Sequence, residues 1–78
     1  MPNWIKRTIY RPTNEFEREA VRHAQLVMRC PVTGEMDEEF IGRLRGLQAL
    51  FGLRITGALD IETAEQIERL VNQYAVRD

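Results

Sequence analysis

One stretch decides the fold of this 78-residue chain: LRGLQALFGLRITGALDIETAEQI, residues 44–67. Apolar residues at helical spacing run into Gly52, and a short non-helical link follows them. Gly57 in that link supplies a backbone conformation that other residues reach only with strain. Asp60 then begins a second helix, because an aspartate side chain accepts hydrogen bonds from the free amides of a first helical turn. We therefore expect a helix, a structured link and a second helix.

The same unit occurs once already upstream. Shifting the chain by 23 positions aligns residues 21–37, VRHAQLVMRCPVTGEMD, with residues 44–60. The identical pairs are Arg22/Arg45, Gln25/Gln48, Thr33/Thr56, Gly34/Gly57 and Asp37/Asp60. The helix that closes the first copy opens the second. Because the glutamine, threonine, glycine and aspartate recur among different neighbours, we interpret them as structural, with each glutamine hydrogen-bonding link backbone that helices cannot satisfy.

These units predict an all-α fold, a compact three-helix bundle over residues 14–78. Asn14, with Glu17 in a capping box, begins the first helix, which runs to about residue 29. Asp37 and Asp60 begin the other two, which run to Gly52 and to about residue 74. The stripe expected to face inward from the second helix is Phe40, Ile41, Leu44, Leu47, Leu50 and Phe51.

Two further packing expectations concern the second unit. Leu53, Ile55 and Leu59 alternate along the link and should fill the gap between the helices. Gly42 and Gly46 each cost a helix roughly 1 kcal/mol relative to alanine, so a close helix–helix approach is the expected reason for them.

Residues 1–13, which we call the arm, precede the bundle and lack helical periodicity. The arm carries three basic residues and no acid, and we expect it to be extended. Its apolar side chains need cover, either from the chain's own helices or from a neighbouring molecule. The candidate partner-binding residues on the arm are Trp4, Ile5, Ile9 and Tyr10.

Charge and composition exclude several functional classes. Eleven basic against twelve acidic side chains give a net charge of −1, which is not the balance of a nucleic-acid binder. A helix-turn-helix protein needs a shorter turn and a basic recognition helix, whereas the last helix here carries Glu62, Glu65 and Glu68 against Arg69. No apolar run has signal-peptide or membrane-spanning length. We expect a chain made in the cytoplasm without a signal peptide, and neither a nucleic-acid nor a membrane partner.

The residues needed for catalysis are also missing. The chain has no serine, and its one histidine, His23, lies seven positions before its one cysteine, Cys30. No two histidines or cysteines stand at metal-ligand spacing. Twelve acids would allow a glycosidase pair by number, but helix starts already account for Asp37, Asp60 and the glutamates after them. We predict a protein that is not an enzyme and has neither cofactor nor metal.

The link and its flanks resemble the peptidoglycan-binding-domain-like family, small three-helix modules of bacterial and phage cell-wall hydrolases and metalloproteinase prodomains. The matching residues are Leu47-Gln48, Gly52-Leu53, Ile55-Thr56-Gly57, Asp60 and Thr63. The resemblance covers about residues 15–72 and leaves out the arm. The prodomain cysteine-switch sequence is missing after the last helix, and Cys30 aligns with Leu53 as a core residue.

The resemblance leaves two functional readings open. In the first, the chain is a structural subunit of a larger assembly, such as a phage capsid or tail, and would be found in the virion; the arm docks on neighbouring protein subunits. In the second, the module binds peptidoglycan and targets a partner to the bacterial wall. Arg45 and Arg54 are then the candidate ligand-binding residues, because guanidinium groups form forked hydrogen bonds with stem-peptide carboxylates.

Overall fold

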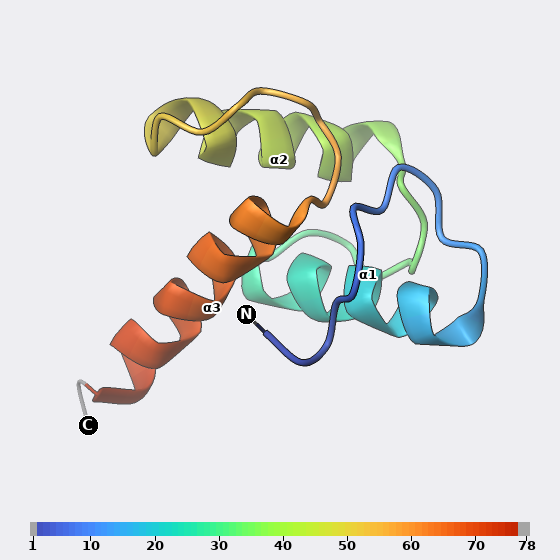
Figure 1. Cartoon of the computed structure of the whole chain (residues 1–78), viewed down its shortest axis with the longest axis horizontal. Coiled ribbons are helices and arrows are strands. Elements are labelled where there is room, and N and C mark those ends of the chain that lie inside the picture. The colour runs from blue at the N-terminus through green and yellow to red at the C-terminus, as the bar shows by residue number, and fades with distance from the viewer. Residues whose placement is uncertain (1, 77–78) are drawn as a thin grey trace.

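Three helices and two structured links make up the fold in the computed structural model, which describes residues 2–76 and the side chains of residues 2–72. The helices are α1 (Glu15–Val27), α2 (Glu38–Leu50) and α3 (Ile61–Val76) (Figure 1). Within the described residues the only β-type pairing is one isolated bridge, between Ile9 and Leu59. The predicted all-α, three-helix architecture is confirmed. A radius of gyration of 11.6 Å is close to the ~11.5 Å expected of a compact domain of this length.

The first two helices begin at the predicted caps. The Asn14 side chain accepts from the amide of Glu17 at 2.8 Å, and the Asp37 side chain accepts from the amide of Phe40 at 2.9 Å. The capping box at Asn14 is only half formed. The carboxylate of Glu17 turns back one residue further, to the amide of Thr13 at 2.9 Å. Its second bond therefore fastens the end of the arm to the first turn of α1.

The core lies where α1, α2 and α3 meet. Its buried apolar side chains include Val21 and Ala24 from α1, Phe40 and Leu44 from α2, and Ile67 from α3. Figure 1 shows α3 crossing beneath α2, and α1 packs against α3. The close-approach expectation for Gly42 and Gly46 was wrong. A Cβ built on either glycine meets nothing within 4 Å, because both residues lie on the solvent face of α2.

The arm folds back onto the chain's own helices. Ile5 and Ile9 are each 1% exposed and belong to the same core cluster as the helices. Ile9 and Leu59 exchange two backbone hydrogen bonds, of 2.9 and 3.0 Å. Of the two alternatives that the sequence left open, the chain's own helices, and not a neighbouring molecule, cover these apolar side chains. In this structure the side chains of Ile5 and Ile9 are not available to a neighbouring molecule.

Candidate functional site

The first link is organised around one buried glutamine. Gln25 is fully buried, and its Oε1 accepts from the amides of Thr33 and Gly34, both at 2.9 Å. Its Nε2 donates to the Thr33 hydroxyl and to the carbonyl of Glu35, both at 3.0 Å. The Thr33 hydroxyl donates onward to Asp37, which caps α2. The link thus has an internal hydrogen-bond network between two helices.

The second link repeats this network. Gln48, also fully buried, accepts from the amides of Thr56 and Gly57, both at 3.0 Å, and donates to the carbonyl of Ala58 at 3.0 Å. Thr56 donates to Asp60 at 2.8 Å, as Thr33 does to Asp37. Here Gln48 has one further contact, to the hydroxyl of buried Thr63 at 3.0 Å. The interpretation of the glutamine, threonine, glycine and aspartate as structural residues is confirmed.

The repeated arginines lie over the repeated glycines. Gly34 and Gly57 have φ angles of +77° and +71°, in the left-handed region that favours glycine. A Cβ on Gly57 would lie 2.9 Å from Nε of Arg45, and a Cβ on Gly34 would lie 3.0 Å from Nε of Arg22. Arg45, a candidate ligand-binding residue, therefore packs on its own link, in the same place as Arg22 in the first copy.

The two copies differ at the ends of their first helices. Val27 and Met28 are half-buried at the end of α1 and pack against the core. Their equivalents in the second copy are Leu50, which is 77% exposed, and Phe51, which is 41% exposed. The backbone at the two ends is the same, since the amides of Met28 and Phe51 each donate four residues back along the chain. The two helix ends therefore have the same backbone conformation, and they differ in how much of their apolar side chains neighbouring residues bury.

The second link adds to the exposed region at the end of α2. Ile55 is 58% exposed, and Arg54 beside it is exposed, with a guanidinium that makes no hydrogen bond or ion pair with the described residues. We call Leu50, Phe51, Arg54 and Ile55 the α2-end surface. The expectations that Leu50 and Phe51 face inward and that Ile55 fills the gap between helices were wrong. Figure 1 shows the reason: the end of α2, in yellow, lies at the edge of the molecule with no helix across it.

The predicted partner residues of the arm have separate roles in the structure. Trp4 is half-buried, donates from Nε1 to the Glu68 carboxylate at 2.8 Å, and packs edge-on against His23 with ring centroids 4.6 Å apart. Tyr10 is 68% exposed and is the one of the four that presents its ring to solvent. The structure does not bring these four residues together into one exposed surface.

An ion pair between exposed Arg7 and buried Glu17 holds the arm beside α1. Arg7 donates from Nε and Nη2 to the two carboxylate oxygens of Glu17, at 2.6 and 2.8 Å. The Thr13 amide, with help from Arg7, holds the pKa of Glu17 below its usual value of 4.5, against the opposing effect of burial. Glu17 is only 6% exposed, so its carboxylate depends on these partners rather than on water.

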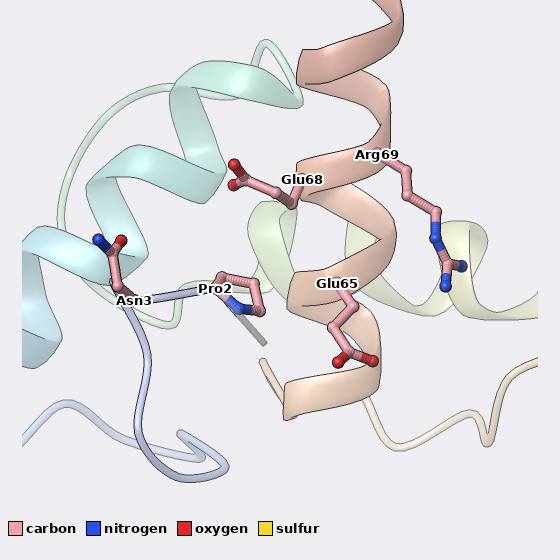
Figure 2. A pocket seen from close by; sticks show the side chains of 5 residues that line it. All are labelled: Pro2, Asn3, Glu65, Glu68 and Arg69. Atoms are coloured by element: carbon pink, nitrogen blue, oxygen red, sulfur yellow. The ribbon is translucent and has the colours of Figure 1, made fainter.

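A cleft of about 510 Å³ lies between the start of the arm and α3 (Figure 2). Its lining residues are Pro2, Asn3, Glu65, Glu68 and Arg69. Figure 2 shows Glu68 directed toward α1, where it accepts from Trp4, while Arg69 extends away on the other side of α3. The Arg69 guanidinium donates to Gln66 at 3.1 Å. The cleft presents carboxylates but no nucleophile or histidine.

The two residues with reactive side chains are separate from that cleft. Cys30 is 6% exposed, and burial is the main cause that raises its thiol pKa above the ordinary 9.0. His23 has a buried Nε2 without a hydrogen-bond partner among the described residues, and its ring is packed on Trp4. The described residues hold no cluster of three or more His, Cys, Asp or Glu side chains arranged to bind a metal ion. Among them no helix is long and apolar enough to cross a membrane.

Comparisons with known proteins add no relative to this picture. No protein-family model, curated protein or solved structure matches the chain. The functional inference therefore depends on the α2-end surface, the cleft and the arm. Sequence reasoning missed the hydrophobic part of the α2-end surface, because helical periodicity alone placed Leu50 and Phe51 on the inward stripe.

Proposed function

We propose that the chain is a non-catalytic binding module of the peptidoglycan-binding-like type and a subunit of a larger protein assembly, and that it contacts its protein partner through the α2-end surface. The fold type is supported by the family's motif residues. Gln48, Thr56, Gly57, Asp60 and Thr63 all take part in the network of the second link. A phage capsid or tail is the kind of assembly that the resemblance suggests.

The observation that carries the proposal is the exposure of Leu50 and Phe51. Complete burial of a leucine or phenylalanine side chain contributes about 1.5–3 kcal/mol, so leaving both in water forgoes a large stabilisation for a domain of this size. Ile55 and Arg54, which follow Phe51 closely in the chain, are exposed as well. An apolar centre with an arginine rim is typical of protein–protein contacts. The arm is a poorer candidate for docking, because Ile5 and Ile9 belong to the core.

Site-specific photocrosslinking tests this proposal. A benzoylphenylalanine is placed at position 50, at position 26 or at position 10 of the full chain, in the cells or particles from which it comes. Leu26 and Tyr10 are matched controls, being 67% and 68% exposed against 77% for Leu50. We expect a discrete protein adduct from position 50 only. An adduct from position 10 alone would mean that the arm makes the contact. If position 50 gives no adduct, the proposal is contradicted.

A second candidate function, binding to peptidoglycan, is favoured by one observation: the Arg54 side chain is exposed without a partner among the described residues. A free guanidinium next to apolar side chains suits a stem-peptide carboxylate. Sedimentation with purified cell-wall sacculi tests it, with Arg54→Ala as the variant. Retention of the wild type and loss of the variant would support wall binding. If both stay in the supernatant, this second function is ruled out.

A further inference from the structure

The repeat defines where the next helix of this architecture would lie. The helices of the first copy are α1 and α2, and those of the second are α2 and α3, so one step along the repeat moves each helix to the next. Along that series α1 packs against α3, the helix two steps on. The same step applied to α2 calls for a fourth helix against α2. α3 is the last helix that the structure describes, so that position holds none of the described chain.

Burial at equivalent positions supports this assignment. Cys30 is buried, whereas its equivalent Leu53 is only half-buried. Together with Val27 and Met28 against Leu50 and Phe51, this makes three equivalent positions that are each more exposed in the second copy. Arg43, Arg45 and Gly46 are likewise more exposed than their equivalents Ala20, Arg22 and His23, so the difference extends along α2.

The polar contacts at the two helix ends differ in the same way. In the first copy, Arg43 of α2 donates to the carbonyl of Met28 at 3.0 Å, across the end of α1. The equivalent of Arg43 in α3 is Gln66, which accepts from Arg69 of its own helix instead. Because Gln66 belongs to α3, which the structure describes, this polar difference is a change of residue within α3, and the apolar difference is the one that points to a fourth helix.

Charge indicates the chemistry of the missing neighbour. Residues 40–59 contain three arginines, Arg43, Arg45 and Arg54, and no aspartate or glutamate. The equivalent residues of the first copy, 17–36, contain three arginines and three glutamates. Although α2 begins with Glu38 and Glu39, the part of the chain from Phe40 to Leu59 carries only positive side chains, so an acidic partner is attracted to the end of α2 and a basic one is repelled.

Resting on the proposed function, we infer that the α2-end surface binds an acidic amphipathic helix of a partner protein, in the position that a fourth helix of the repeat would occupy. Leu50, Phe51 and Ile55 would receive apolar residues spaced three and four apart on that helix, the usual pattern when a helix docks into a hydrophobic surface. Arg54 would lie beside its carboxylates. The contact has the same relation to α2 that α3 has to α1.

The chain supplies a suitable probe in its own sequence. A synthetic peptide of residues 61–76, IETAEQIERLVNQYAV, is amphipathic and carries three glutamates against one arginine. It is titrated into the ¹⁵N-labelled full chain, and amide shifts locate the contact. A matched peptide with lysine at the three glutamate positions keeps the apolar face and reverses the charge. A 16-residue peptide is only partly helical in water, so binding is expected to be weak, and amide shifts detect weak binding.

The expected result is a set of saturable shifts at residues 50–55 with the acidic peptide, at least about tenfold weaker binding with the lysine peptide, and weakening on addition of salt. Leu50→Glu should weaken binding of the acidic peptide by about tenfold or more, whereas Leu26→Glu should leave that binding unchanged. Both side chains are exposed, so neither variant removes core packing, and circular dichroism checks that each stays folded. No shifts at millimolar peptide, equal binding of the lysine peptide, or shifts away from residues 50–55 would each overturn the inference.

The photocrosslinking experiment separates the two levels of the proposal. An adduct from position 50 whose partner segment is basic, or is extended rather than helical, would leave the proposed protein contact intact and overturn the acidic helix. Absence of any adduct from position 50 would remove the proposed contact itself.

Discussion

Replacing Gln48 with alanine should cost the domain about 3–5 kcal/mol of its free energy of unfolding. The side chain is fully buried and bonds the amides of Thr56 and Gly57, the carbonyl of Ala58 and the hydroxyl of Thr63. Each buried polar group left without a partner costs about 1–3 kcal/mol, and at least the Gly57 amide and the Ala58 carbonyl are buried. A domain of this length has only about 4–12 kcal/mol in total. One substitution should therefore remove much of the stability.

Thermal and urea unfolding followed by circular dichroism measure this effect. At about 4–8 °C per kcal/mol for a small domain, the melting temperature should fall by about 12 °C or more. Gln25→Ala should cost nearly as much, though less by about one hydrogen bond, because Gln25 has no equivalent of the Thr63 contact. Gln66→Ala is the control: Gln66 is half-buried and makes one exposed hydrogen bond, with Arg69, so this variant should stay within about 1 kcal/mol of wild type. A loss below about 1 kcal/mol for both buried glutamines would refute the reasoning.

Four further predictions concern the arm, the glycines, one carboxylate and the thiol. Ile9→Ala should cost about 2–5 kcal/mol in urea unfolding, because its side chain is 1% exposed in the core. Gly46→Ala should stabilise by up to about 1 kcal/mol, since its Cβ would meet open space, whereas Gly57→Ala should destabilise because its φ is +71°. The lowered pKa of Glu17 contributes stability that is present above pH 4.5 and is lost as the pH falls through the folded-state pKa. Glu17→Gln should therefore reduce the fall in the free energy of unfolding at acidic pH. Cys30 should react with a thiol reagent at pH 8 about tenfold or more slowly in the native protein than in urea, because burial raises its pKa.

Each of these has a result that would count against it. Tyr10→Ala should be nearly neutral beside Ile9→Ala, and equal losses would mean that the arm is not part of the core. A destabilising Gly46→Ala would indicate a neighbour on the outer face of α2. If the free energy of unfolding falls equally at acidic pH in Glu17→Gln and in the wild type, the pH dependence belongs to other carboxylates. Equal thiol reactivity in the native and unfolded states would place Cys30 at the surface.

The sequence predicted the parts of the fold that local chemistry determines. Asn14 and Asp37 cap their helices because a short polar side chain directly before an apolar stripe can accept a hydrogen bond from a free amide of the first turn. The networks of Gln25 and Gln48 followed from their repetition, since a polar residue that recurs at the same step among different neighbours is bound to the backbone rather than to a ligand.

The parts that failed depend on the third dimension. Helical periodicity assigned Leu50 to the inward stripe, but which turn of a stripe is covered depends on where the neighbouring helix crosses. Gly42 and Gly46 have the spacing of a close helix contact, yet they lie on the face of α2 that no helix reaches. The arm has no periodicity to interpret, and its place in the core depends on contacts between residues distant in sequence, such as the pairing of Ile9 with Leu59 and the hydrogen bond from Trp4 to Glu68.

Native-state amide hydrogen exchange is the most direct test of the central claim, that one hydrogen-bonded unit is used twice. The amides of Thr33, Gly34, Thr56 and Gly57 lie in links, yet each donates to a buried glutamine. All four should exchange as slowly as amides in the helices, and Gln48→Ala should speed the exchange of the second pair more than that of the first pair, which follows the overall loss of stability. If the four exchange as fast as free link amides in the wild type, the two copies are not held as described.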